Sequence, residues 1–156
     1  MIKILFVCHG NICRSPIAEF VMKDLVKKAG RANEFHIASA AVSREEIGNP
    51  VHPGTRKILK EHGISTAGKY ARQMTKQDYE DYDYLIAMDR WNIRNMMRIL
   101  GEDPQQKIHL LLDFADSHGD IADPWYTGNF EVTYRDVVRG CEGLLKYLLK
   151  YLQNKK

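Results

Sequence analysis

The feature that most constrains the fold is a short apolar segment followed directly by a loop and a helix. The segment 2–7 reads IKILFV, a nearly continuous apolar run rich in β-branched side chains. Such a run is typical of a strand buried on both faces of a parallel sheet. After the loop 8–14, Ser15 and Pro16 predict an N-cap and a first helical residue. Apolar residues then recur at helical spacing, and we expect the helix to reach Lys28.

The rest of the chain alternates between the two patterns. Short apolar runs predict further strands at 35–39, 84–88 and 108–111. Three- and four-residue apolar steps predict helices at 55–62, at 91–100 and from Phe130 onward. This alternation predicts an α/β fold in which residues 1–156 form a single three-layer domain. Its four-stranded parallel twisted sheet would carry helices on both faces and bind ligands beyond the carboxyl ends of the strands.

The composition is that of an ordinary globular protein and argues against several classes of function. Hydrophobic residues make up 44% of the 156 residues, and the net charge of +3 comes from scattered basic side chains. We therefore expect no nucleic-acid binding, and we interpret the terminal pair Lys155-Lys156 as a solvated tail. The sequence has neither a membrane-spanning apolar stretch nor the pattern of a secretory signal, which predicts a cytoplasmic protein without membrane contact.

The three cysteines, Cys8, Cys13 and Cys141, are expected to be free thiols. They cannot all pair within one chain, and a domain with this apolar content does not need disulfides. Their spacing is not that of a metal site, so we expect neither metal nor cofactor. Cys13 has two interpretations: a small buried residue, or a thiol that traps oxidised Cys8 as a disulfide.

The loop at 8–15 has the residues of an anion cradle. It lies between a predicted strand and a helix N-terminus, where the backbone NH groups of residues 9–14 can turn toward a phosphate. Gly10 permits the turn, and Arg14 offers a planar fork to two phosphate oxygens. Cys8 would lie beneath the phosphorus, with its thiolate form stabilised by these dipoles and by Arg14. A buried structural cysteine, the alternative, needs none of these neighbours.

The segment 7–19, which reads VCHGNICRSPIAE, resembles the signature of the low-molecular-weight protein tyrosine phosphatases. The resemblance continues in the family's order through Ser39-Ala40-Ala41, Ile47-Gly48-Asn49-Pro50, His62-Gly63-Ile64, Ala71-Arg72-Gln73, Met88-Asp89 and Asp123-Pro124. It implies the same α/β fold and a phosphate-binding loop formed by His9, Gly10, Asn11, Ile12, Cys13 and Arg14. It also implies a monomeric enzyme that works without metal. The implied activity is hydrolysis of phosphotyrosine in proteins, and of small aryl phosphates, through a cysteinyl-phosphate intermediate. Phosphate or another oxyanion would occupy the site.

The resemblance also implies a role for each residue around the loop. Cys8 would attack phosphorus, and Arg14 would hold the equatorial oxygens. The Ser15 hydroxyl would hydrogen-bond the thiolate and help it to leave; the alternative for Ser15 is a plain N-cap. Asn11 and Ser39 would brace the loop.

The leaving alcohol needs a proton, and a carboxylic acid on its side of the phosphate is the natural donor. Asp123 precedes a proline in the aperiodic segment 113–128, which we expect to be a long functional loop. The resemblance implies that Asp123 is the general acid, although an aspartate before proline is also a common turn initiator. Asp89 follows the third predicted strand. The resemblance implies that it positions the arginine, and a helix N-cap is the alternative.

The substrate pocket is expected to be walled by aromatic and loop side chains. Trp125 and Tyr126 stand beside the acid, and His9 and Ile12 face the same mouth. An aromatic wall suits phosphotyrosine better than phosphoserine because the phenyl ring adds reach and stacking surface.

The chain departs from the family pattern around this site. The family usually carries tyrosine where this chain has Trp125, and an aromatic residue where it has Glu45, which we place in the substrate pocket. A histidine that supports the loop asparagine in some members is matched, at the nearest position, by Lys69.

Three other functions share part of this pattern. An arsenate reductase of the same fold needs extra cysteines after the third strand, and the segment 88–111 contains none. A phosphoarginine phosphatase tends to carry threonine at the position of Ile12, so Ile12 favours ester hydrolysis. A module that only binds phosphorylated partners has no use for Cys8, Arg14 and Asp123 together.

Overall fold

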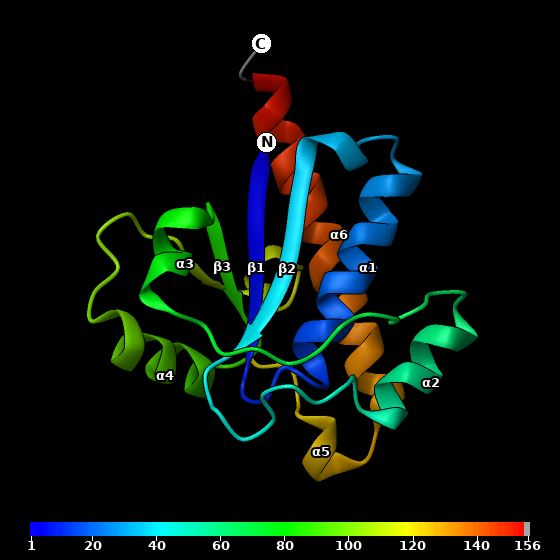
Figure 1. Ribbon diagram of the computed structural model, residues 1–156. Coiled ribbons are helices and arrows are strands. Elements are labelled where there is room, and N and C mark those ends of the chain that lie inside the picture. The colour runs from blue at the N-terminus through cyan, green and yellow to red at the C-terminus, as the bar shows by residue number, and fades with distance from the viewer. Residues whose placement is uncertain (155–156) are drawn as a thin grey trace.

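The protein folds around a four-stranded parallel sheet, as the computed structural model of residues 1–154 shows (Figure 1). The strands are β1 (Ile2–Cys8), β2 (Phe35–Ala41), β3 (Tyr84–Ala87) and β4 (Ile108–Leu110), in the order β2-β1-β3-β4. The predicted α/β class and the parallel sheet are thereby confirmed. The pair Lys155-Lys156, interpreted above as a solvated tail, lies outside the described residues.

Helices cover both faces of this sheet (Figure 1). They are α1 (Arg14–Lys28), α2 (Pro53–Glu61), α3 (Lys76–Asp81), α4 (Arg90–Leu100), α5 (Pro124–Thr127) and α6 (Phe130–Asn154), with 3₁₀ turns at Ala32–Glu34 and Leu111–Phe114. Side chains from α1, α2 and α6 pack on one face, and side chains from α3 and α4 pack on the other. Among the described residues, no helix is long and apolar enough to cross a membrane.

The central strand β1 explains the two-sided core. Ile4 and Phe6 point into the cluster under α1 and α6, whereas Leu5 and Val7 point into the cluster under α3 and α4. All four side chains are fully buried. Successive side chains of a strand alternate between faces, so a continuous apolar run fits only a strand covered on both sides. Burial of each side chain contributes roughly 1.5–3 kcal/mol.

The carboxyl ends of the strands meet at one edge, where the functional residues gather. In the sheet register Cys8 lies opposite Ala41, and Val7 lies opposite Ala87. The backbone NH of Ile121 donates to the carbonyl of Met88, 2.9 Å away, just beyond the end of β3. That bond brings the distant segment around α5 to the same edge (Figure 1).

The start of α1 differs from the prediction. The helix begins at Arg14, its N-cap is Cys13, and the cap makes no side-chain hydrogen bond. The interpretation of Ser15 as the N-cap is therefore wrong, because Ser15 already lies inside the first turn. Pro16 is tolerated there because the first NH groups of a helix have no intrahelical partner in any case.

Two short helices were missed by the sequence patterns. Helix α3 begins with a capping box formed by Thr75 and Asp78, and α5 is a single turn inside the segment 113–128, predicted to be a loop. Elements this short do not span enough residues to show a period. The other predicted elements are present, with ends that differ by one or two residues.

Two glycines in α6 let it approach the turn Leu111–Phe114 closely. A Cβ on Gly140 would stand 2.5 Å from Cγ of Leu111, and one on Gly143 would overlap the carbonyl of Phe114. These glycines weaken helix propensity, but here they permit backbone contact with the turn that leads toward α5. The apolar stripe of α6 accordingly forms a long helix despite them.

Candidate active site

The sulfur of Cys8 lies within hydrogen-bond distance of three groups from Asn11 and Ser15. Cys8 is 3% exposed, and its Sγ accepts from the backbone NH groups of Asn11 and Ser15 at 3.3 and 3.4 Å. The Ser15 hydroxyl lies 3.0 Å from the sulfur. Because this hydroxyl already accepts from the Asn11 amide at 2.8 Å, its own hydrogen is free to point at the sulfur. Three donors are therefore directed at one sulfur atom.

Asn11 gives the loop its shape. Its φ of 59° lies in the left-handed region, where asparagine is one of the few residues found regularly. The side-chain amide holds this conformation: Nδ2 donates to Ser15 and, at 2.9 Å, to the Ser39 hydroxyl, while Oδ1 accepts from the backbone NH of Arg72 at 3.2 Å. Ser39 and Asn11 are thus joined by a hydrogen bond, and their expected role of bracing the loop stays a prediction.

A buried carboxylate stands behind Ser39. The Ser39 hydroxyl donates to Oε1 of Glu19 at 2.6 Å, and Glu19 is only 5% exposed. Lys23 and Lys69 approach the same carboxylate, at 2.6 and 3.5 Å. Lys69 also donates to the carbonyl of Ser39 at 2.9 Å, and burial lowers the pKa of its ammonium group. A chain of polar contacts therefore runs from the two lysines to Asn11.

Sequence reasoning did not assign a role to Glu19, although it lies in the segment 7–19. A glutamate with lysine four residues later is a common surface pair on a helix, so the pattern alone did not distinguish it. Only its location on the buried side of α1, beneath β2, reveals the contact with Ser39.

Replacing Glu19 with alanine is expected to lower the free energy of unfolding by about 3 kcal/mol, because it leaves Lys69 and the Ser39 hydroxyl without their buried partner. Urea unfolding followed by circular dichroism measures the change. The matched control is Glu131→Ala, which removes an exposed pair with Arg135 and should cost no more than about 0.5 kcal/mol. Equal midpoints for the two variants would contradict a structural role for Glu19.

The two Nη atoms of Arg14 contact acidic groups and a carbonyl, whereas its Nε has no partner within residues 1–154. Its Nη1 donates to Asp89 at 2.5 Å and to the carbonyl of Ile121 at 2.9 Å, and Nη2 lies 3.3 Å from Asp123. Its Nε is buried and has no hydrogen-bond partner among residues 1–154. Burial opposes the charge, but Cys8 and the two aspartates outweigh it and raise the pKa of the guanidinium. A fixed cation with an unpartnered donor suits an oxyanion.

Each of the two aspartates has a structural contact and a contact with Arg14. Oδ1 of Asp89 accepts from the backbone NH of Asn92 at 2.7 Å and caps α4, while its other oxygen holds Arg14. Oδ1 of Asp123 accepts from the backbone NH of Trp125 at 3.0 Å and caps α5, while Oδ2 faces Arg14. The cap and the arginine contact are therefore compatible in both residues.

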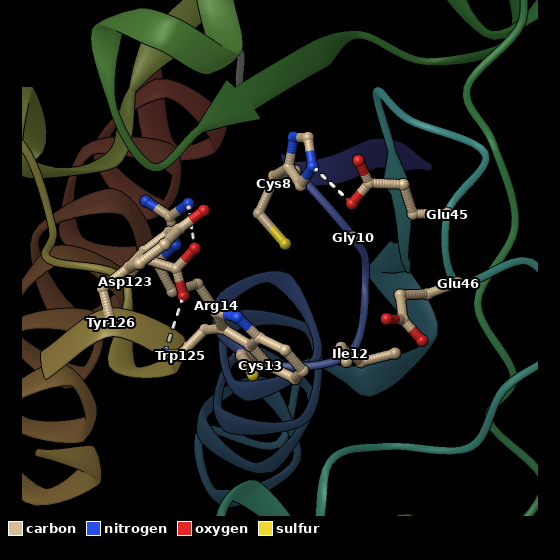
Figure 2. Close-up of a pocket in the computed structure, with 11 residues that line it drawn as sticks. Cys8, Gly10, Ile12, Cys13, Arg14, Glu45, Glu46, Asp123, Trp125 and Tyr126 are labelled. Carbon is tan, nitrogen blue, oxygen red and sulfur yellow. Dashed lines mark hydrogen bonds and ion pairs between the residues drawn. The ribbon is translucent and has the colours of Figure 1, made fainter. Parts of the chain in front are cut away.

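A cavity of about 100 Å³ opens above the sulfur (Figure 2). Its lining consists of Cys8, His9, Gly10, Ile12, Cys13, Arg14, Glu45, Glu46, Asp123, Trp125 and Tyr126. All the predicted pocket residues are among them, although they come from three separate parts of the chain. Glu46 was not predicted, since nothing in its local pattern distinguishes it from other acidic loop residues.

The rim of the cavity combines aromatic and charged side chains. Trp125 is 58% exposed, and its ring meets His52 edge to face with centroids 5.7 Å apart. Tyr126 is more exposed still. Across the mouth, Nε2 of His9 lies 3.0 Å from a carboxylate oxygen of Glu45.

The other two cysteines have raised pKa values. Burial raises the pKa of Cys13 to about 12, with Cys8 and Asp123 adding to the effect, and burial also raises the pKa of Cys141. All three cysteines are free. Cys13 is buried and also lines the cavity, so both interpretations of it stand, and a disulfide with Cys8 under oxidation stays a prediction. Within residues 1–154, no group of three or more metal-binding side chains is suited to hold an ion.

Comparisons with known proteins agree with this geometry. Residues 3–156 match the family model of the low molecular weight phosphotyrosine protein phosphatases. The low molecular weight protein-tyrosine-phosphatase YfkJ of Bacillus subtilis is 44% identical over 155 residues, covering 98% of this chain and 99% of that protein. The crystal structure of YfkJ superimposes with a TM-score of 0.93 at 45% identity, covering 97% of this chain and 96% of that one. A low molecular weight protein tyrosine phosphatase from Streptococcus pyogenes gives a TM-score of 0.87 at 42% identity, covering 98% of both chains.

Proposed function

This chain belongs to the low molecular weight phosphotyrosine protein phosphatase family, and from that premise we propose that Cys8 takes the phosphoryl group from phosphotyrosine and passes it to water. The observation that carries the proposal is the pairing of two features in one cavity. The Cys8 sulfur is surrounded by NH and OH donors, and the buried Nε of Arg14 has no partner within residues 1–154. A nucleophile and an oxyanion donor are thereby held together.

In the first step the Cys8 thiolate attacks phosphorus. An S–P bond forms while the bond from phosphorus to the tyrosine oxygen breaks, and Asp123 gives its proton to that oxygen. Arg14 and the NH groups of residues 9–14 hold the three equatorial oxygens as charge develops on them.

In the second step water attacks the cysteinyl phosphate. Asp123, now a carboxylate, takes a proton from the water, and the S–P bond breaks to release inorganic phosphate. The Ser15 hydroxyl, 3.0 Å from the sulfur, stabilises the departing thiolate. Asn11 keeps that hydroxyl oriented because its amide occupies the acceptor side of the oxygen.

The wider setting is proposed on the same basis. Residues 1–156 act as one phosphatase domain, supported by the family match over residues 3–156. The substrate is a phosphotyrosine-containing protein, the enzyme is a cytoplasmic monomer, and the chemistry above has no step that calls for a metal or cofactor. Ile12 lines the cavity, which supports ester rather than phosphoarginine hydrolysis. Cys141 is buried in α6 and does not line the cavity, which argues against its acting as the resolving thiol of an arsenate reductase.

Rapid mixing with p-nitrophenyl phosphate tests the proposal. We expect a burst of nitrophenol equal to the enzyme concentration, unchanged by chelator, and an acid-quenched phosphoryl adduct on the peptide that contains Cys8. Phosphoarginine and arsenate with a thiol donor serve as comparison substrates and should turn over more slowly. A chelator-sensitive rate, or phosphate attached to another residue, would redirect the mechanism.

A further inference from the structure

The segment that follows β2 is hydrogen-bonded to the phosphate-binding loop. The backbone NH of Val42 donates to the carbonyl of Cys8 at 3.0 Å, and the NH of Ser43 donates to the carbonyl of His9 at 3.1 Å. These bonds place Glu45 and Glu46 at the mouth of the cavity. Figure 2 shows both carboxylates on one side of the opening and Asp123 with Tyr126 on the other.

Neither of the two carboxylates at the mouth has a lysine or arginine partner within residues 1–154. The side chain of Glu46 lies against Gly10, where an added Cβ would stand 3.3 Å from its Cγ. Its carboxylate accepts from the Asn49 amide at 2.5 Å. Within residues 1–154, the exposed carboxylate of Glu45 has the imidazole of His9 as its one hydrogen-bond partner. Neither pairs with a lysine or an arginine in that part of the chain.

The charges of the cavity are divided between its inner and outer ends. Arg14 is 2% exposed at the inner end, where its unpartnered Nε is available to a phosphate oxygen. The outer end carries Glu45 and Glu46, with Asp123 between the two ends. Once the negative charge of a bound phosphate group balances the positive charge of Arg14, the cavity lining carries more acidic than basic side chains. A peptide anchored by its phosphate therefore presents its neighbouring residues to a negative rim.

We propose that Glu45 and Glu46 make this enzyme prefer phosphotyrosine flanked by lysine or arginine over phosphotyrosine flanked by acidic residues. The inference rests on the proposed function, since it concerns the peptide that the same cavity receives. Exposed charge pairs have modest energies, so two of them give a preference of about three- to tenfold in kcat/KM. The effect belongs mainly in KM, because the flanking charge meets the rim equally in the ground state and the transition state.

Three peptides that differ only beside the phosphotyrosine provide the test. With lysine, alanine or glutamate at the flanking positions, kcat/KM should fall in that order at low ionic strength. The ratio of the lysine to the glutamate peptide should approach one in about 0.5 M salt, where the Debye length is only about 4 Å. p-Nitrophenyl phosphate, which has no flanking residues, is the reference substrate.

Variants then assign the preference to the rim. The double variant Glu45→Gln with Glu46→Gln keeps the shape of both side chains and should bring the lysine-to-glutamate ratio close to one. Glu61→Gln, an exposed change near the end of α2, should leave the ratio at its original value. A ratio near one in the parent enzyme, or an unchanged ratio in the double variant, overturns the inference alone if the alanine peptide is hydrolysed. Failure to hydrolyse any of the substrates overturns the proposed function and the inference with it.

Discussion

Replacing Cys8 with serine is expected to lower kcat for aryl phosphates by at least about four powers of ten. The donors around the sulfur are arranged for a thiolate, and a serine hydroxyl at the same position keeps its proton at neutral pH. Without an anionic nucleophile no covalent intermediate forms, so the burst should also disappear. Steady-state and rapid-mixing assays with p-nitrophenyl phosphate measure both quantities.

Binding and a second cysteine provide the controls for this prediction. Because Arg14 remains in place, the Cys8→Ser variant should still bind inorganic phosphate in a calorimetric titration. Cys141→Ala removes a fully buried thiol on α6, away from the cavity lining, and should keep kcat within about twofold of the parent. Turnover by Cys8→Ser above about one per cent of the parent rate would assign the nucleophile to another residue.

Replacing Asp123 with alanine is expected to slow hydrolysis by roughly two to four powers of ten, the usual contribution of acid catalysis. The carboxyl lies at the cavity beside Arg14, where a leaving oxygen would need its proton. The loss should grow with the basicity of the leaving group, because a phenolate that is already stable needs less protonation. A series of aryl phosphates with phenols of increasing pKa measures this dependence.

Two asparagine variants distinguish the loss of proton donation from the loss of the helix cap. Asp123→Asn keeps an oxygen that can accept from the NH of Trp125 and cap α5, yet it has no acidic proton to give. It should therefore lose about as much activity as Asp123→Ala while it unfolds at the same temperature as the parent. Asp120→Asn, in the same segment but outside the cavity lining, should stay active. Equal rates for Asp123→Asn and the parent would move the acid to another carboxyl.

The position of the loop 8–14 between a strand and a helix was predictable because its information is local. Cys8 and Arg14 lie in one short segment between a strand and a helix, and some of the bonds that shape it join neighbours such as Asn11 and Ser15. An apolar run, a glycine-bearing turn and a helical period are all legible without knowing the rest of the fold. The same local signals misplaced the start of α1, since a serine before proline resembles a cap in any context.

The position of Asp123 at the cavity was not predictable in this way. Asp123 was one of twenty acidic residues, and the pair Asp123-Pro124 by itself indicated only a turn. The expected role of Asp123 came from the family resemblance. In the structure Asp123 meets Arg14 across 109 positions of sequence, because Ile121 binds to the end of β3 beside the central strand. Such a meeting depends on strand order, which a local pattern does not contain.

Sequence alone thus determined which groups the loop carries, from the thiol and the arginine to the helix behind them, because all of them lie within one short segment. Tertiary structure decided which distant groups surround it: Glu19 beneath Ser39, and Glu46 at the mouth beside Gly10. Both are ordinary acidic residues in their local sequence. The physical reason is that sheet order and helix packing set their neighbours, and a carboxylate's role follows from the groups that it meets after the chain has folded.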